Sequence, residues 1–155
     1  MRFVVFDTES DGFVHEATKI HVLGYSEDGE NVTTTHSYED MTEFFSQEDV
    51  MFVCHNAVRF DMPLVNKILG LNLKFDQFVD TLALSWYLEH QRQSHGLAAW
   101  GEEFGVPKPE IDDWQNRTPE EYAHRVREDV KINFALWKRL ERKLGVLYGY
   151  KTKSA

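Results

Sequence analysis

A short apolar run ending in two carboxylates constrains this chain more than any other feature of its sequence. Residues 3–6 are aromatic and β-branched, which is typical of a buried strand. Asp7 and Glu9 follow, and because alternate side chains of a strand share a face, both should emerge on one side of its end. Carboxylates this close repel each other unless a cation lies between them, and Mg²⁺ takes such oxygen ligands. Taken alone, however, the pattern favours a solvated acidic turn at residues 9–12.

Two later segments place polar side chains at comparable positions. His55–Asp61 follows a second apolar run, Val50–Cys54, and leads into a helix with a proline in its first turn. Within this segment, Asp61 fits the role of a helix N-cap and Asn56 that of a turn residue, and neither assignment excludes a role as a ligand. The third segment, His124–Asp129, precedes a long amphipathic stretch, where charged clusters usually form an exposed helix face. Each segment has an ordinary structural explanation that leaves a ligand role open.

The apolar runs and turn residues predict one α/β domain over residues 1–155, with a mixed five-stranded sheet covered by helices on both faces. A hairpin comes first and strand–helix alternation follows. The expected strands are Arg2–Phe6, Ile20–Ser26, Asn31–His36, Val50–Cys54 and Phe78–Val79. The expected helices are Asp40–Phe45, Asp61–Leu69, one capped by Asp80 and running to Leu88, one capped by Ser94 and running to Phe104, and a long one after Thr118. We interpret Asp80 as an N-cap in preference to a metal ligand.

Together the three segments resemble the DnaQ-like, or DEDD, 3′–5′ exonucleases. The family motifs are an Asp-x-Glu after a strand, an Asn a few residues before an aromatic–Asp pair, and a His five residues before the last Asp. The matching residues are Asp7 and Glu9, then Asn56 with Phe60 and Asp61, then His124 and Asp129. The order and spacing agree over the whole chain. The resemblance implies an RNase H-like fold and a phosphodiester hydrolase.

A closer likeness is to the proofreading domain of family A DNA polymerases from short-tailed phages. It rests on His55-Asn56, Asp80-Thr81-Leu82, Ser94-His95-Gly96-Leu97 and Trp100-Gly101. That domain usually carries a Tyr four residues before its last Asp, where this chain has Arg125. The His subtype of the family therefore fits better.

The resemblance also implies a metal site and a general base. Two Mg²⁺ or Mn²⁺ ions about 3.5–4 Å apart would activate a water and stabilise the leaving 3′ oxygen. Asp7 would bridge both ions, and Glu9, Asp61 and Asp129 would complete their ligands. His124 would take the proton from the attacking water.

The geometry of a helix complicates the role of His124. On a continuous helix, His124 would lie about 140° around the axis from Asp129, so we expect the backbone to break or turn near it. Tyr122, seven residues before Asp129, would share the face of that carboxylate and is the alternative base.

The expected substrate is the 3′ end of a single strand, bound through stacking and backbone contacts. Thr8 and Asn56 are candidates for polar contacts, and Phe13 and Phe60 for apolar wedges or for core packing. DNA is favoured over RNA because the nearer likeness is to a proofreading domain. The alternatives are an RNA exonuclease of the oligoribonuclease kind, a non-catalytic interaction module on the same fold, and an endonuclease of the RNase H or resolvase type.

The charge distribution suits a site of this kind better than the net charge of −9 suggests. Residues 1–58 hold twelve acidic and two basic side chains, whereas the remainder holds fourteen and fifteen. Two bound divalent ions would locally reverse the field of the acidic cluster. No apolar run approaches a membrane span and no signal peptide is recognisable, so we expect no membrane contact and a cytoplasmic location, in the host cell if the chain is phage-encoded. The alternatives for its partners are a free-standing exonuclease, a subunit that acts with a separate DNA polymerase, or a fragment excised from a longer protein.

Overall fold

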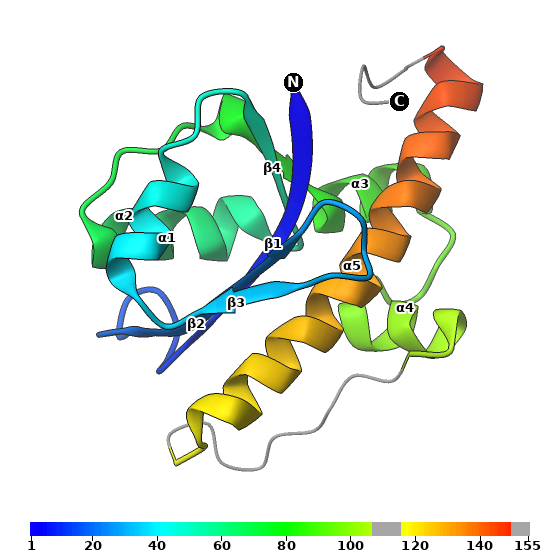
Figure 1. The fold of residues 1–155 in the computed structure, drawn as a ribbon. Helices are drawn as coiled ribbons and strands as arrows, with labels where there is room; N and C mark the ends of the chain where they lie inside the picture. Colours follow the sequence, from blue (N-terminus) through cyan, green and yellow to red (C-terminus); the bar gives the residue numbers. More distant parts are fainter. Residues whose placement is uncertain (107–115, 150–155) are drawn as a thin grey trace.

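A mixed five-stranded sheet forms the centre of the computed structural model, which describes residues 1–106 and 116–149 (Figure 1). The strand order is β3-β2-β1-β4-β5, with β1 antiparallel to β2 and parallel to β4. The hairpin β2–β3 and the parallel pair β4–β5 complete the sheet. The strands are β1 (Arg2–Ser10), β2 (Ile20–Ser26), β3 (Thr33–Thr35), β4 (Val50–Cys54) and β5 (Phe78–Asp80). The predicted RNase H-like sheet is therefore confirmed.

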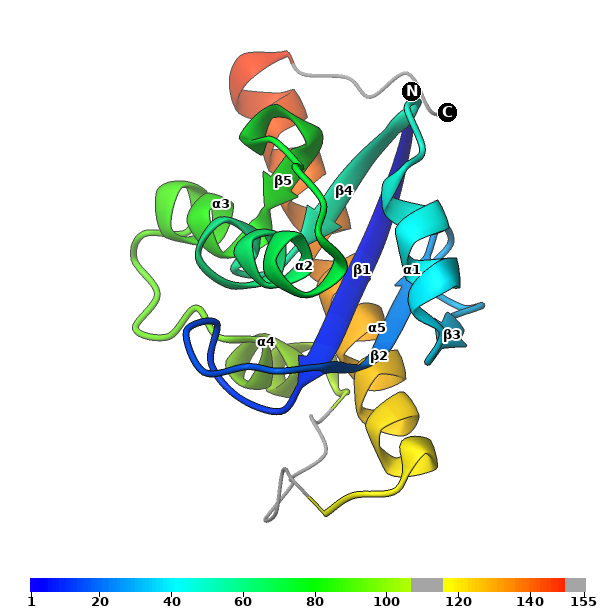
Figure 2. The ribbon, with the colours of Figure 1, turned by 90° about the vertical axis from the view of Figure 1, so that its left-hand side faces the viewer.

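Helices cover both faces of this sheet (Figures 1 and 2). On one face lie α1 and α2, and on the other lies the long helix α5, against which α3 and α4 pack. The helices are α1 (Tyr38–Phe45), the π-helical turn η1 (Ala57–Asp61), α2 (Met62–Leu69), the 3₁₀ turn η2 (Phe75–Gln77), α3 (Thr81–Leu88), α4 (Leu97–Phe104) and α5 (Pro119–Tyr148). None of the described helices has the length and apolar character needed to traverse a bilayer.

The alternation of side chains along β1 explains how the two layers form. Val4 and Phe6 pack into the layer of α1 and α2, whereas Val5 packs against α5. The ring of Phe6 lies 5.2–6.1 Å, centroid to centroid, from four aromatic rings: Phe44, Phe45, Phe52 and Phe78. The same alternation assigns Asp7 and Glu9 to the α5 face and Thr8 to the opposite face.

A close approach to β2 determines where α5 crosses the sheet. A Cβ atom built on Gly24 would lie 2.0 Å from Cγ1 of Val126, so only glycine leaves room for the helix at this point. Further along α5, the ring of Trp137 stacks on Phe3 with centroids 5.5 Å apart. These contacts hold α5 across β1 and β2, with Asp129 between them in sequence.

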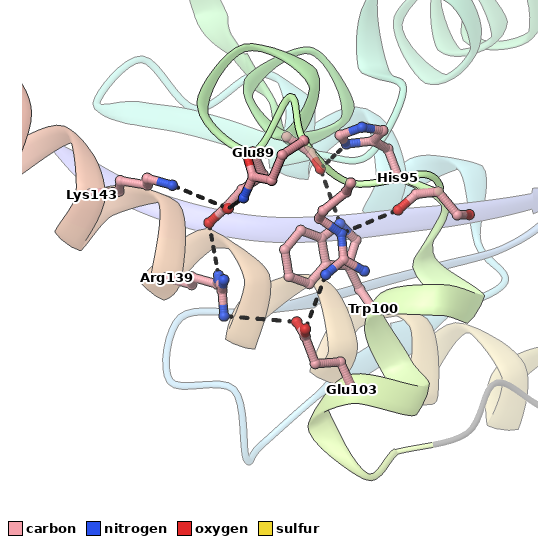
Figure 3. A network of polar contacts seen from close by, with 10 residues as sticks. Glu89, His95, Trp100, Glu103, Arg139 and Lys143 are labelled. Atoms are coloured by element: carbon pink, nitrogen blue, oxygen red, sulfur yellow. Dashed lines mark hydrogen bonds and ion pairs between the residues drawn. The ribbon is translucent and has the colours of Figure 1, made fainter.

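A polar network fastens the end of α3 to α5 (Figure 3). Glu89 is only 2% exposed. Its carboxylate accepts a hydrogen bond from Arg139 Nε at 2.9 Å and pairs with Lys143 Nζ at 3.1 Å. Burial by itself would raise the pKa of Glu89, but the hydrogen bonds from Arg139, Lys143 and Gln91 outweigh it and hold the pKa at about 2. Glu89 is therefore ionised in the folded protein at any ordinary pH.

The same network continues into α4 through Trp100 (Figure 3). The indole Nε1 of Trp100 donates to Ser85 Oγ at 3.0 Å, and that hydroxyl also bonds His95 Nδ1 at 2.6 Å. The guanidinium of Arg92 lies 3.5 Å above the Trp100 ring and pairs with Glu103 at 3.0 Å. These contacts fix the loop between α3 and α4, at the end of which the chain approaches the carboxylates of β1.

The structure corrects several predicted boundaries. β1 continues to Ser10 because it pairs with β2, with Glu9 opposite Val22, so both carboxylates lie within the strand instead of beyond its end. β3 is shorter than predicted, α1 begins two residues earlier, and Gly96 instead of Ser94 is the N-cap residue of α4.

The break expected near His124 does not occur. α5 is helical from Pro119 to Tyr148, and Thr118 caps it through the backbone N–H of Glu121. Its buried stripe, which includes Val126 and Val130, packs continuously against the sheet and favours an unbroken helix.

Candidate active site

Three carboxylates from two elements meet where α5 crosses β1. Asp7 and Glu9 come from β1 and Asp129 comes from α5. One oxygen from each of the three lies within 4.8 Å of the others. Glu9 and Asp129 are buried and Asp7 is partly buried, so most of the surface of these side chains is covered by protein. Burial of this much negative charge favours a cation among the oxygens.

A fourth carboxylate, Asp61, lies close to Asp7. It ends η1, is 3% exposed, and accepts a hydrogen bond from Thr8 Oγ1 at 2.6 Å. Ligand atoms of Asp7, Cys54 and Asp61 also lie within 4.8 Å of one another, so Asp7 belongs to both groups. Burial raises the pKa of Asp61 to about 6. Hydrogen bonds from Thr8 and Cys54 lower the pKa and the nearby charge of Asp80 raises it, but burial is the largest effect.

The donor atoms suit a hard divalent cation. Burial raises the pKa of the Cys54 thiol well above its ordinary value, with the charges of Asp61 and Asp7 adding to the effect. A protonated thiol is a poor ligand, because the thiolate is the form that binds metals. The remaining donors are carboxylate oxygens, which are the ligands that Mg²⁺ and Mn²⁺ prefer. Asp7, Glu9, Asp61 and Asp129 are thus the four residues that would hold such ions.

The backbone before η1 turns sharply at Asn56, which lies in the left-handed region at φ 70° and ψ 36°. Asn tolerates this conformation better than most residues. The carboxylate of Asp80 holds the turn, accepting from the backbone N–H of Asn56 at 2.9 Å and of Val58 at 3.1 Å. Asp80 also accepts from the N–H groups of Leu82 and Ala83, so its predicted role as an N-cap is confirmed. Sequence reasoning identified the cap but had no signal for the bonds to the distant turn.

A chain of hydrogen bonds connects His55 to α5. Its Nδ1 lies 2.9 Å from Thr81 Oγ1, and that hydroxyl donates to Asn133 Oδ1 at 2.6 Å. Thr81 and Asn133 are buried, and Asn133 follows Asp129 by one helical turn. The imidazole is therefore positioned by the helix that carries a carboxylate of the cluster. From sequence, His55 was only part of the phage-like motif.

These residues surround a cavity of about 350 Å³. Its lining comprises Asp7, Thr8, Glu9, His55, Asn56, Phe60, Asp61, Leu82, Gly96, Leu97, Arg125 and Asp129. It therefore includes all four predicted ligands and the three residues predicted to contact substrate, Thr8, Asn56 and Phe60. Phe60 is half-buried and packs against the apolar core, as one of its two predicted roles requires, and its contact with substrate stays a prediction.

A second cavity of about 380 Å³ adjoins the first and shares Thr8, Glu9 and Phe60 with it. Its outer wall includes Phe13, which is 67% exposed. Phe13 and Phe60 thus place two aromatic rings beside the carboxylates, in a space that exceeds what two ions need.

The two candidate bases lie outside these cavities, and Arg125 lies within the first. His124 is exposed, and Tyr122 is buried with its ring stacked on His21 at a centroid distance of 4.1 Å. Because α5 is continuous, the side chain one turn before Asp129 is Arg125, and its Nε lies 3.3 Å from Glu9 Oε1. Sequence reasoning noted Arg125 as a departure from the phage pattern and placed it near Asp129 on a continuous helix, but assigned it no role.

Comparisons with known proteins agree with this architecture. A sequence profile of the RNase H superfamily matches residues 4–129. NrnC from Brucella melitensis with bound Mg²⁺ superposes with a TM-score of 0.75 at 18% identity, over 94% of this chain and 75% of that one. Escherichia coli RNase D superposes with a TM-score of 0.68 at 16% identity, over 94% of this chain and 40% of that one. Exonuclease X in complex with 5′ overhanging duplex DNA superposes with a TM-score of 0.59 at 16% identity, over 96% of this chain and 94% of that one.

No curated protein matches the chain significantly. At 16–18% identity the structural likenesses establish a shared fold. The profile match covers most of the chain, from within β1 to Asp129 on α5. The chain therefore belongs to the RNase H superfamily.

Proposed function

We propose that this protein is a metal-dependent 3′–5′ exonuclease that releases nucleoside monophosphates from the ends of single strands. The observation that carries the proposal is the convergence of four carboxylates on one cavity, with Asp7 common to both groups of ligand atoms. A cluster held by three separate elements needs tertiary structure to form, which a solvated acidic turn does not.

The structurally similar proteins support this chemistry. The NrnC structures include one with bound Mg²⁺ and one bound to pGG, and RNase D is described as an exoribonuclease. The Exonuclease X structure is a complex with 5′ overhanging duplex DNA. These proteins place nucleic acids on the same fold.

The side chains of the cavity have distinct roles in this proposal. Two bound ions would lower the pKa of a water and stabilise the departing 3′ oxygen. Thr8 holds Asp61 in place through its hydroxyl, and Asp80 holds the turn that presents Asn56. The terminal base would lie in the adjoining cavity against Phe60 and Phe13, since stacking on aromatic rings accepts any base.

The identity of the general base is a separate prediction, and His124 is the residue that we propose. For His124 to act, the first two turns of α5 have to unwind and bring the imidazole toward Asp129. On this hypothesis His124→Ala lowers kcat by about 10²–10⁴-fold, the usual contribution of a general base. Tyr122→Phe, which removes one hydroxyl from a buried ring, should leave kcat nearly unchanged. An unchanged rate in His124→Ala would mean that α5 stays continuous during the reaction and that residue 124 takes no part.

End-labelled oligomers test the proposed activity directly. With Mg²⁺ or Mn²⁺ we expect 5′-labelled single strands to shorten in single-nucleotide steps, and EDTA to stop the reaction. Strands with blocked 3′ ends and circular single strands should stay intact. Cutting of circles would indicate an endonuclease, and activity unaffected by EDTA would refute the metal-dependent mechanism.

We propose that DNA is the preferred substrate and that the protein acts in proofreading together with a separate DNA polymerase. RNA is the second candidate, because the structurally similar RNase D is described as an exoribonuclease involved in structured RNA processing. Initial rates on DNA and RNA oligomers of the same sequence decide between them. A polymerase role further requires faster removal of a mismatched than of a matched primer end.

A further inference from the structure

Arg125 is the one lysine or arginine in the described lining of the carboxylate cavity. Its side chain is 10% exposed, and its Nε lies 3.3 Å from Glu9 Oε1, whose own side chain is 9% exposed. The position follows from the phase of α5, which presents residues 125 and 129 on one face. A guanidinium thus lies inside the group of oxygens that would bind cations.

A buried guanidinium is costly to desolvate, so its retention beside metal ligands calls for a physical reason. One reason is the excess of negative charge, because Arg125 offsets part of the charge of Asp7, Glu9, Asp61 and Asp129. Two divalent ions would neutralise the four carboxylates by themselves. The positive charge of Arg125 would then no longer be needed to offset these four carboxylates.

The substrate carries the matching negative charge. A phosphodiester has one negative charge, and the planar fork of arginine binds phosphate oxygens through two parallel hydrogen bonds. Because the Asp7–Glu9–Asp129 cluster and Arg125 share the cavity, a phosphate placed for hydrolysis lies within reach of the same side chain.

We propose that Arg125, which pairs with Glu9, is a phosphate-binding residue that moves to the scissile phosphate when Glu9 binds a cation. The inference rests on the proposed function and extends it to a residue outside the family motifs. It has two consequences. Arg125 weakens cation binding when no phosphate is present, and it makes the binding of cation and phosphate cooperative.

Calorimetric titration with Mn²⁺, without any substrate, tests the first consequence. Arg125→Gln removes the competing cation and should bind Mn²⁺ about 5-fold more tightly or better, within the usual range of coupling between sites. Arg127→Gln is the matched control, because Arg127 lies on the same helix but bonds Thr34 Oγ1 at 3.2 Å outside the cavity. This control should bind Mn²⁺ like the wild-type chain.

Thymidine 5′-monophosphate, as a probe for the phosphate, tests the second consequence. We expect it to tighten Mn²⁺ binding in the wild-type chain and to do so at least about 5-fold less in Arg125→Gln. Arg125→Lys keeps the charge but loses the fork. It should retain the wild-type Mn²⁺ affinity and show a reduced nucleotide effect, so it tests the proposal even if Arg125→Gln does not fold.

The outcomes separate this inference from the proposed function. If Arg125→Gln and Arg125→Lys match the wild type in Mn²⁺ affinity and in the nucleotide effect, Arg125 is a structural ion pair and the inference is wrong. If neither the wild type nor the variants bind Mn²⁺, the metal-dependent function fails as well.

Discussion

Asp7→Asn is expected to abolish the release of nucleotides, which is the largest effect on activity that we predict. Asp7 is common to both groups of ligand atoms, so its loss affects both proposed ions at once. We expect the rate on end-labelled oligomers to fall by well over 100-fold, which is about the upper limit when only the partner of a metal ligand is lost. Mn²⁺ binding, measured by calorimetry, should weaken in parallel.

The fold of this variant should persist, because the substitution removes one of several repelling carboxylates from a partly buried site. Its thermal unfolding temperature without metal should equal or exceed that of the wild type. Asp76→Asn, an exposed carboxylate outside both cavities, is the matched control and should leave rate and stability unchanged. Wild-type digestion rates in Asp7→Asn would refute the two-metal site.

Glu89→Gln destabilises the protein by about 3 kcal/mol at neutral pH, our largest predicted effect on stability. The pKa of Glu89 falls from an ordinary 4.5 to about 2 in the folded protein, and each unit of difference corresponds to about 1.4 kcal/mol. The neutral amide cannot pair with Arg139 and Lys143 as the carboxylate does. Denaturation by urea at pH 7 measures the change in the free energy of unfolding.

The effect of Glu89→Gln should depend on pH with a definite sign. The pKa of Glu89 is lower in the folded than in the unfolded chain, so its stabilisation is complete above about pH 4.5 and is lost as the pH falls through about 2. The difference between wild type and variant should therefore shrink between pH 5 and pH 2. Glu103→Gln, which changes a more exposed partner in the same network, should cost less than about 1 kcal/mol. An equal difference at pH 7 and pH 3 would contradict the assignment.

The parts of the site that were predictable from sequence follow local rules. Alternation along β1 places Asp7 and Glu9 on one face, and the capping geometry of Asp80 depends only on residues up to three positions away. Both features form wherever their own segments form. The boundaries that differed, at the end of β1 and the start of α4, depend on pairing with β2 and on packing against α5.

The order of strands and helices determined the fold class by itself, because strand alternation and helix capping act over a few residues. The set of four carboxylates was predicted from the resemblance of the motif residues to the DEDD exonucleases. Tertiary structure alone decided which side chains of α5 face the cavity. The phase of a thirty-residue helix depends on contacts with distant strands, such as Val126 on Gly24 and Trp137 on Phe3. Those contacts turn Arg125 toward Glu9 and leave His124 exposed to solvent, which no local pattern of residues could determine.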